Sequence, residues 1–297
     1  MLSCHTELAS PPPRRLYFAA MARPARFLLL GAFAALALAA LLGGAWLVAS
    51  PPRIETAEAS LPLPPEPPRF AEGPEADRCF ALLRTDAEAA QAFARDWEAQ
   101  GGADGAQHCA ALALLARGDI ERAAEQLEAL ARRSGAGKAA RAAVFAQAAQ
   151  AWLMAAEPAR AFAATTLALS LTPDDVELLI DRAAALGTME RFGEAVADLD
   201  RALASDPGRP DALVFRAAAW RNLDRAEPAR RDVEQALALD PGNAEALLER
   251  GILRQLAGDT EGARMDWERA IEIAPHSAAA DLAFQNLALN EAGPAAR

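Results

Sequence analysis

The chain has 297 residues, of which 53% are hydrophobic, 24% charged and 6% aromatic. This composition supports a sizeable buried core and excludes a disordered chain, and its alanine and leucine favour packed helices over an all-β fold. The 41 acidic side chains outnumber the 30 basic ones and give a net charge of -11, which disfavours nucleic acid as a partner.

The N-terminal region carries the sequence of a membrane segment. A basic segment, 1–26, precedes 27–49, which holds no charged residue and would reach about 34 Å as a helix, enough for a bilayer core of about 30 Å. The arginines before it predict a cytoplasmic N-terminus and a translocated body. The alternative is a signal peptide cleaved near Ala59, and Met21 is an alternative start.

Residues 50–73 follow as a proline-rich linker. Prolines at 51, 52, 62, 64, 65, 67 and 68 disfavour helix and sheet and predict an extended spacer between the membrane and the body.

An internal repeat of 34 residues organises the rest of the chain. Prolines recur at this step, and so do small residues that allow helices to approach closely. The columns are Pro173, Pro207, Pro241, Pro275; Ala161, Ala195, Ala229, Ala263; Ala168, Ala202, Ala236, Ala270; and Ala149, Ala183, Ala217, Gly251. Each unit predicts two amphipathic helices ended by the proline.

These columns resemble the tetratricopeptide repeat (TPR) family, whose unit is a 34-residue helix-turn-helix. The resemblance implies an all-α solenoid. We expect a degenerate hairpin over 74–103, a solenoid over 104–277 and a capping helix and tail over 278–297. The predicted units are 104–137, 142–175, 176–209, 210–243 and 244–277.

Charged residues also recur every 34 positions. Arginines lie in the predicted first helices and aspartates in the second helices: Arg182, Arg216 and Arg250, with Asp198, Asp232 and Asp266. Some family members pair such residues between packed helices, so we expect a row of partly buried salt bridges, with anion binding by the arginines as the alternative.

The resemblance implies that the first helices line a concave surface that holds peptides. The predicted groove residues are Glu177, Asp181, Asp211, Arg221, Glu245, Glu249 and Gln255. They favour a basic or polar peptide as the partner, although acids in a first helical turn also complement the helix dipole.

Catalytic chemistry finds little support in the sequence. Three histidines and three cysteines show no metal-site or nucleophile spacing, so we expect no enzyme activity, no metal and no cofactor. Cys79 and Cys109 lie in the first helices of successive hairpins, and oxidation is permitted outside the cytoplasm, which predicts a disulfide; two buried thiols are the alternative.

The sequence therefore predicts a non-enzymatic protein-interaction scaffold. We expect it in a bacterial inner membrane as a single-pass protein, held in the bilayer by 27–49 with its repeats in the periplasm, or soluble there after cleavage. The alternative function is that of an accessory factor in envelope, cytochrome or outer-membrane protein assembly.

Overall fold

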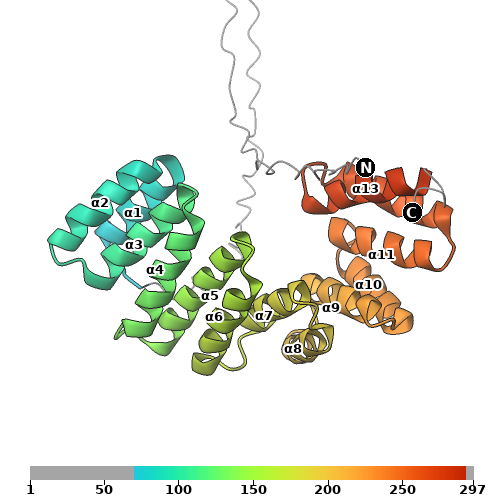
Figure 1. The fold of residues 1–297 in the computed structure, drawn as a ribbon, viewed down its shortest axis with the longest axis horizontal. Coiled ribbons are helices and arrows are strands. Elements are labelled where there is room, and N and C mark those ends of the chain that lie inside the picture. Colours follow the sequence, from blue (N-terminus) through green and yellow to red (C-terminus); the bar gives the residue numbers. More distant parts are fainter. Residues whose placement is uncertain (1–69, 292–297) are drawn as a thin grey trace, which may run out of the picture. The chain divides into compact units, whose positions relative to one another are not determined.

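A computed structural model of the chain describes residues 70–291, and these residues form thirteen consecutive α-helices without a strand (Figure 1). The helices are α1 Pro74–Thr85, α2 Ala87–Ala99, α3 Ala103–Ala116, α4 Ile120–Arg133, α5 Lys138–Met154, α6 Pro158–Leu171, α7 Val176–Thr188, α8 Phe192–Ser205, α9 Pro210–Asn222, α10 Ala226–Leu239, α11 Ala244–Leu256, α12 Thr260–Ile273 and α13 Ala278–Glu291. This confirms the predicted all-α class.

Short polar residues and prolines set the helix starts. The Asp86 side chain accepts a hydrogen bond from the Ala89 amide at the start of α2, at 2.9 Å. Asp175 and Asn243 cap α7 and α11 in the same way. Prolines occupy the first turn of α1, α6 and α9, where the missing amide hydrogen has no helical partner.

From α5 to α12, the turn inside each helical pair contains one residue in the left-handed conformation. This residue recurs every 34 positions, with φ of 59° at Ala156, 59° at Glu190, 57° at Asp224 and 86° at Gly258. Only glycine adopts such angles without a steric penalty, which is about 1–2 kcal/mol for other residues. Packing therefore imposes this turn at Ala156, Glu190 and Asp224, whereas at Gly258 the residue itself favours it.

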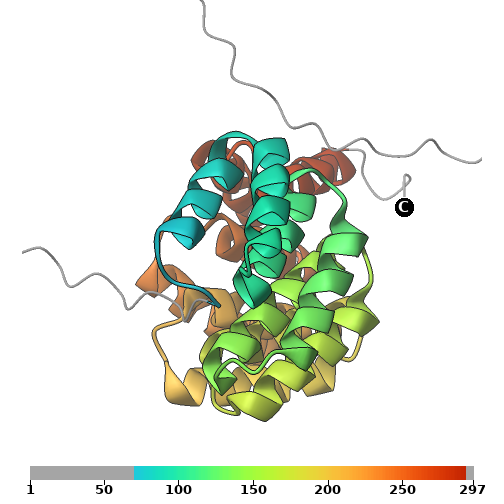
Figure 2. The same ribbon diagram turned by 90° about the vertical axis from the view of Figure 1, so that its left-hand side faces the viewer.

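Each helix packs against the next one along the chain, and the first helices of successive pairs also touch. These first helices are α5, α7, α9, α11 and α13. Fully buried alanines of the second helices, such as Ala161 and Ala229, allow close approach, while Trp152 and Trp267 fill the remaining core volume. Figures 1 and 2 show the chain-order progression of helices from teal to red.

Residues 70–291 contain no helix that is both long and apolar enough to span a bilayer. The predicted membrane segment 27–49, the basic segment before it and most of the predicted linker lie outside the described residues.

Candidate functional site

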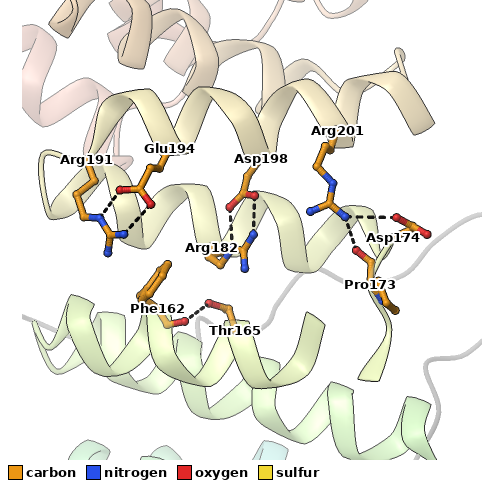
Figure 3. Close-up of polar contacts among 9 residues, drawn as sticks. All are labelled: Phe162, Thr165, Pro173, Asp174, Arg182, Arg191, Glu194, Asp198 and Arg201. Carbon is orange, nitrogen blue, oxygen red and sulfur yellow. Dashed lines mark hydrogen bonds and ion pairs between the residues drawn. The ribbon is translucent and has the colours of Figure 1, made fainter. Parts of the chain in front are cut away.

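The predicted arginine and aspartate columns meet inside each unit. Arg182 Nε and Nη2 donate to both carboxylate oxygens of Asp198 at 2.7 and 2.6 Å (Figure 3). Arg216 binds Asp232 in the same two-pronged way, and Arg250 binds Asp266. The three aspartates are buried, and their hydrogen bonds raise the pKa of each partner arginine. These guanidinium groups hold the first helix against the second and are already occupied by carboxylates.

Surface contacts also connect α8 to the preceding helical pair. Arg191 binds Glu194 through two hydrogen bonds of 2.7 Å, and its guanidinium carbon lies 4.6 Å from the Phe162 ring centroid of the preceding unit. Arg201 donates to the Pro173 carbonyl at 2.8 Å (Figure 3). These contacts connect α8 to the preceding helix pair and to the turn that follows it.

We use the term first-helix face for the surface that the exposed side chains of α5, α7, α9 and α11 form. Two predicted groove acids of this face share a cation that the sequence analysis missed. Arg209 Nε donates to Asp211 at 3.0 Å, and Arg209 Nη2 donates to Glu177 at 3.0 Å. The start of the face therefore has a smaller excess of negative charge than its carboxylates alone would give.

Arg221 and Glu249 are a second pair of predicted groove residues that bind each other. Arg221 Nε donates to Glu249 Oε1 at 2.6 Å, and Glu249 is only 5% exposed. Glu245 is exposed and has no ion pair among the described residues, whereas the Gln255 side-chain oxygen is buried and finds no hydrogen-bond partner there. Glu249 therefore joins two helices and is not available to a peptide.

Asp181 lies between two first helices and titrates unusually. Burial raises the pKa of Asp181 to about 6, a hydrogen bond with Gln150 of α5 opposes that rise, and the negative charges of Glu177 and Asp175 add to it. The carboxyl group is therefore partly protonated just below neutral pH.

One column of the repeat links each first helix to the one before it. Gln147 hydrogen-bonds His108 of α3 at 2.6 Å, Asp181 hydrogen-bonds Gln150, and Glu249 binds Arg221. The fourth member of this column is Phe215, which cannot make such a bond and is 44% exposed. At this column position the junction between α7 and α9 therefore lacks the polar bridge that its neighbours have, and the two helices are linked instead by Arg209 and Glu177 near their starts.

A hollow of about 370 Å³ opens at this junction, and we call it the first hollow. Its lining includes Ala184, Gly187, Thr188, Phe215, Ala218 and Asn222. Gly187 leaves open space in this hollow, because a Cβ added there would meet no atom within 4 Å, while the corresponding positions carry Leu153, Arg221 and Gln255. With small and apolar walls, this hollow suits an apolar side chain.

The predicted cysteine pair lies away from this face. Cys79 of α1 and Cys109 of α3 form a disulfide with a Cα–Cα distance of 6.1 Å. Beside it, burial lowers the pKa of His108, and the hydrogen bond with Gln147 partly offsets that effect. Within residues 70–291 no group of three or more His, Cys, Asp or Glu side chains is placed to hold a metal ion.

Comparisons with known proteins identify solved structures of similar fold. No family model and no curated protein matches the sequence. Among solved structures, YrrB, a TPR protein with an unusual peptide-binding site, is 19% identical over 58% of this chain and 88% of its own, with a TM-score of 0.50. A MamA fragment from Desulfovibrio magneticus RS-1 is 17% identical over 70% of this chain and 99% of its own, with a TM-score of 0.48. The second TPR domain of human RPAP3, solved with an HSP70 peptide, is 24% identical over 40% of this chain and 98% of its own, with a TM-score of 0.38. The 34-residue period, the paired helices and the likeness to YrrB together show that this chain carries the tetratricopeptide-repeat fold.

Proposed function

We propose that the protein is a non-enzymatic scaffold whose first-helix face binds a segment of a partner protein, with an apolar side chain of that segment in the first hollow. The observation that carries this proposal is the exposed Phe215, which lines the first hollow together with Gly187 and is the member of the bridging column where an aromatic ring replaces a polar group. YrrB, which has the same fold, has a peptide-binding site.

The charge around the face supports a partner with basic side chains. Near the starts of α7, α9 and α11 stand four carboxylates, those of Asp175, Glu177, Asp211 and Glu245, against the guanidinium of Arg209, an excess of three negative charges. Lysine or arginine side chains beside the apolar anchor would complement this excess.

We also propose that the repeats are displayed outside the cytoplasm, tethered through 27–49. The support is the uncharged run behind basic residues in the sequence and the Cys79–Cys109 disulfide, a bond that persists in oxidising compartments.

A peptide-display selection against the full-length protein tests the binding function. Gly187→Leu fills the first hollow, and an added side chain meets open space there, so the fold is retained. Gly193→Leu is the matched control, since Gly193 also lies in a helix, has the same open surroundings and lines no part of the hollow. We expect enriched peptides to lose binding to Gly187→Leu and to keep binding to Gly193→Leu; equal binding to both variants would contradict the proposed site.

A further inference from the structure

A second hollow, of about 330 Å³, lies on the other side of α9. Its lining includes Arg221, Asp224, Ala226, Arg230, Leu253 and Leu256. Leu256 is 71% exposed, which is the largest exposure of any large apolar side chain described in residues 70–291.

The two hollows occupy the same place in successive repeats. Gly187, Phe192, Ala219 and Asn222 of the first hollow correspond, 34 residues on, to Arg221, Ala226, Leu253 and Leu256 of the second. One hollow is bounded by α7 and α9 and the next by α9 and α11, so they repeat across a single helix. Two equivalent hollows in successive repeats suit a ligand that carries apolar side chains at a regular spacing.

The separation of the hollows selects the conformation of such a ligand. They flank α9, and one helix with its side chains is about 10 Å wide. A polyproline-II segment presents the same side every third residue at about 3.1 Å per residue, or about 9 Å, whereas a β-strand repeats its side at about 7 Å. Among extended segments, the three-residue step of polyproline II therefore matches the distance across α9 best. An α-helix repeats its side every seven residues at about 10.5 Å and is the competing ligand that the spacing of the anchors distinguishes.

The charges that line the second hollow indicate which kind of ligand residue lies beside the apolar side chain bound there. Arg221 is paired with Glu249 and Arg230 with Glu227, so the charge of each guanidinium is already balanced by a carboxylate. Asp224 is exposed and has no ion pair among the described residues. The C-terminal ends of α9 and α11 add negative partial charge, which the N-terminus of α10 at Ala226 partly offsets. This hollow therefore complements a cation.

We propose that the first-helix face recognises a polyproline-II segment that crosses α9, with two apolar side chains three residues apart in the two hollows and a lysine or arginine next to the second one. This inference rests on the proposed function and specifies the ligand of that same surface. Each apolar side chain would remove apolar area from water in its own hollow, while the cation would meet Asp224.

Synthetic peptides titrated into the full-length protein test the proposal, with binding followed by fluorescence anisotropy. The probes are proline-rich twelve-residue peptides with two leucines at spacings of two, three, four or seven residues and one lysine after the second leucine. We expect the spacing of three to bind tightest, and replacement of either leucine by alanine to weaken binding about 10- to 100-fold. Tightest binding at a spacing of seven would indicate a helical ligand, and equal binding at all spacings would show that the second anchor is unused; either result would overturn the proposal.

Protein variants separate this proposal from the binding function itself. Leu256→Ala should weaken the spacing-three peptide, whereas Met265→Ala, an exposed residue of α12 outside both hollows, should not. Asp224→Asn should abolish the preference for lysine over norleucine, and asparagine tolerates the left-handed backbone at that position. If Gly187→Leu abolishes binding and Leu256→Ala leaves it unchanged, the two-hollow ligand is wrong and the binding function stands. If neither variant matters, both are wrong.

Discussion

Arg221 of α9 and Glu249 of α11 form an ion pair of 2.6 Å whose carboxylate is almost completely buried. The pair ties two successive first helices together at the column position that Phe215 occupies one repeat earlier. One exchange within a repeated column therefore replaces a polar bridge between first helices with an exposed aromatic ring that lines the first hollow.

Arg221→Ala should destabilise the protein by about 2–4 kcal/mol, because it leaves the Glu249 carboxylate buried without a partner; the lower end reflects the partial exposure of Arg221. Urea unfolding followed by circular dichroism measures the change. Adding Glu249→Leu should restore most of the loss, and Arg264→Ala, in an exposed pair, should have no measurable effect. Equal unfolding midpoints for Arg221→Ala and Arg264→Ala would argue against a stabilising pair.

Reduction of Cys79–Cys109 should loosen the N-terminal hairpin selectively. The disulfide closes a loop of 30 residues, for which chain entropy gives about 3–4 kcal/mol. Since repeat folds transmit stability mainly between neighbours, Cys79→Ser with Cys109→Ser should speed hydrogen exchange in α1 and α2 and leave α9 to α12 unchanged. Uniformly faster exchange in all helices would contradict this local role.

Asp181 should make stability fall as pH rises. Its pKa is about 6 in the folded state and 3.8 when unperturbed, so between these values the folded state binds more protons than the unfolded state. The stabilisation is complete below about pH 4 and is lost by about pH 6, and its full size is about 1–3 kcal/mol. Urea unfolding between pH 4 and 7.5 should show the parent losing stability relative to Asp181→Asn as the pH rises. Groups such as His108, whose lowered pKa has the opposite effect, contribute equally to both profiles, so parallel profiles would exclude the role of Asp181.

Gly251→Ala should destabilise the protein although alanine is the better helix former. A Cβ at Gly251 would lie 2.6 Å from Trp267 Cδ1, and Trp267 is buried, with its Nε1 donating to the Leu248 carbonyl at 3.3 Å. We expect a loss of about 1–3 kcal/mol from overpacking. Gly187→Ala, in open surroundings, should instead stabilise by about 0.5–1 kcal/mol, and differential scanning calorimetry should show the two melting temperatures moving in opposite directions.

Features that recur along the sequence could be predicted, because the 34-residue period repeats one packing arrangement. Arg182 and Asp198 are an example, since their spacing recurs in the next two units and their contact recurs with it. Gly251 follows from the same repetition. It is the one glycine in a column of alanines, and it packs against Trp267, which is the one tryptophan in a column of smaller side chains.

Contacts that occur once could not be predicted in this way. Arg209 binds Glu177 and Asp211, but the positions one repeat before and after it carry Asp175 and Asn243, which cap helices. The sequence shows that the first-helix face carries acidic residues, but which arginine binds each of them depends on the distance between helices. The first hollow depends on a side chain that Gly187 lacks, and its only sequence signal is Phe215 in an otherwise polar column.

The most direct test of the binding function compares two full-length variants, Gly187→Leu and Gly193→Leu, for the affinity of one peptide enriched on the parent protein. Filling the first hollow should weaken binding at least tenfold, because the apolar anchor can no longer be buried, while the control should bind like the parent. Undiminished binding to Gly187→Leu would contradict the assignment of the first-helix face as the binding site.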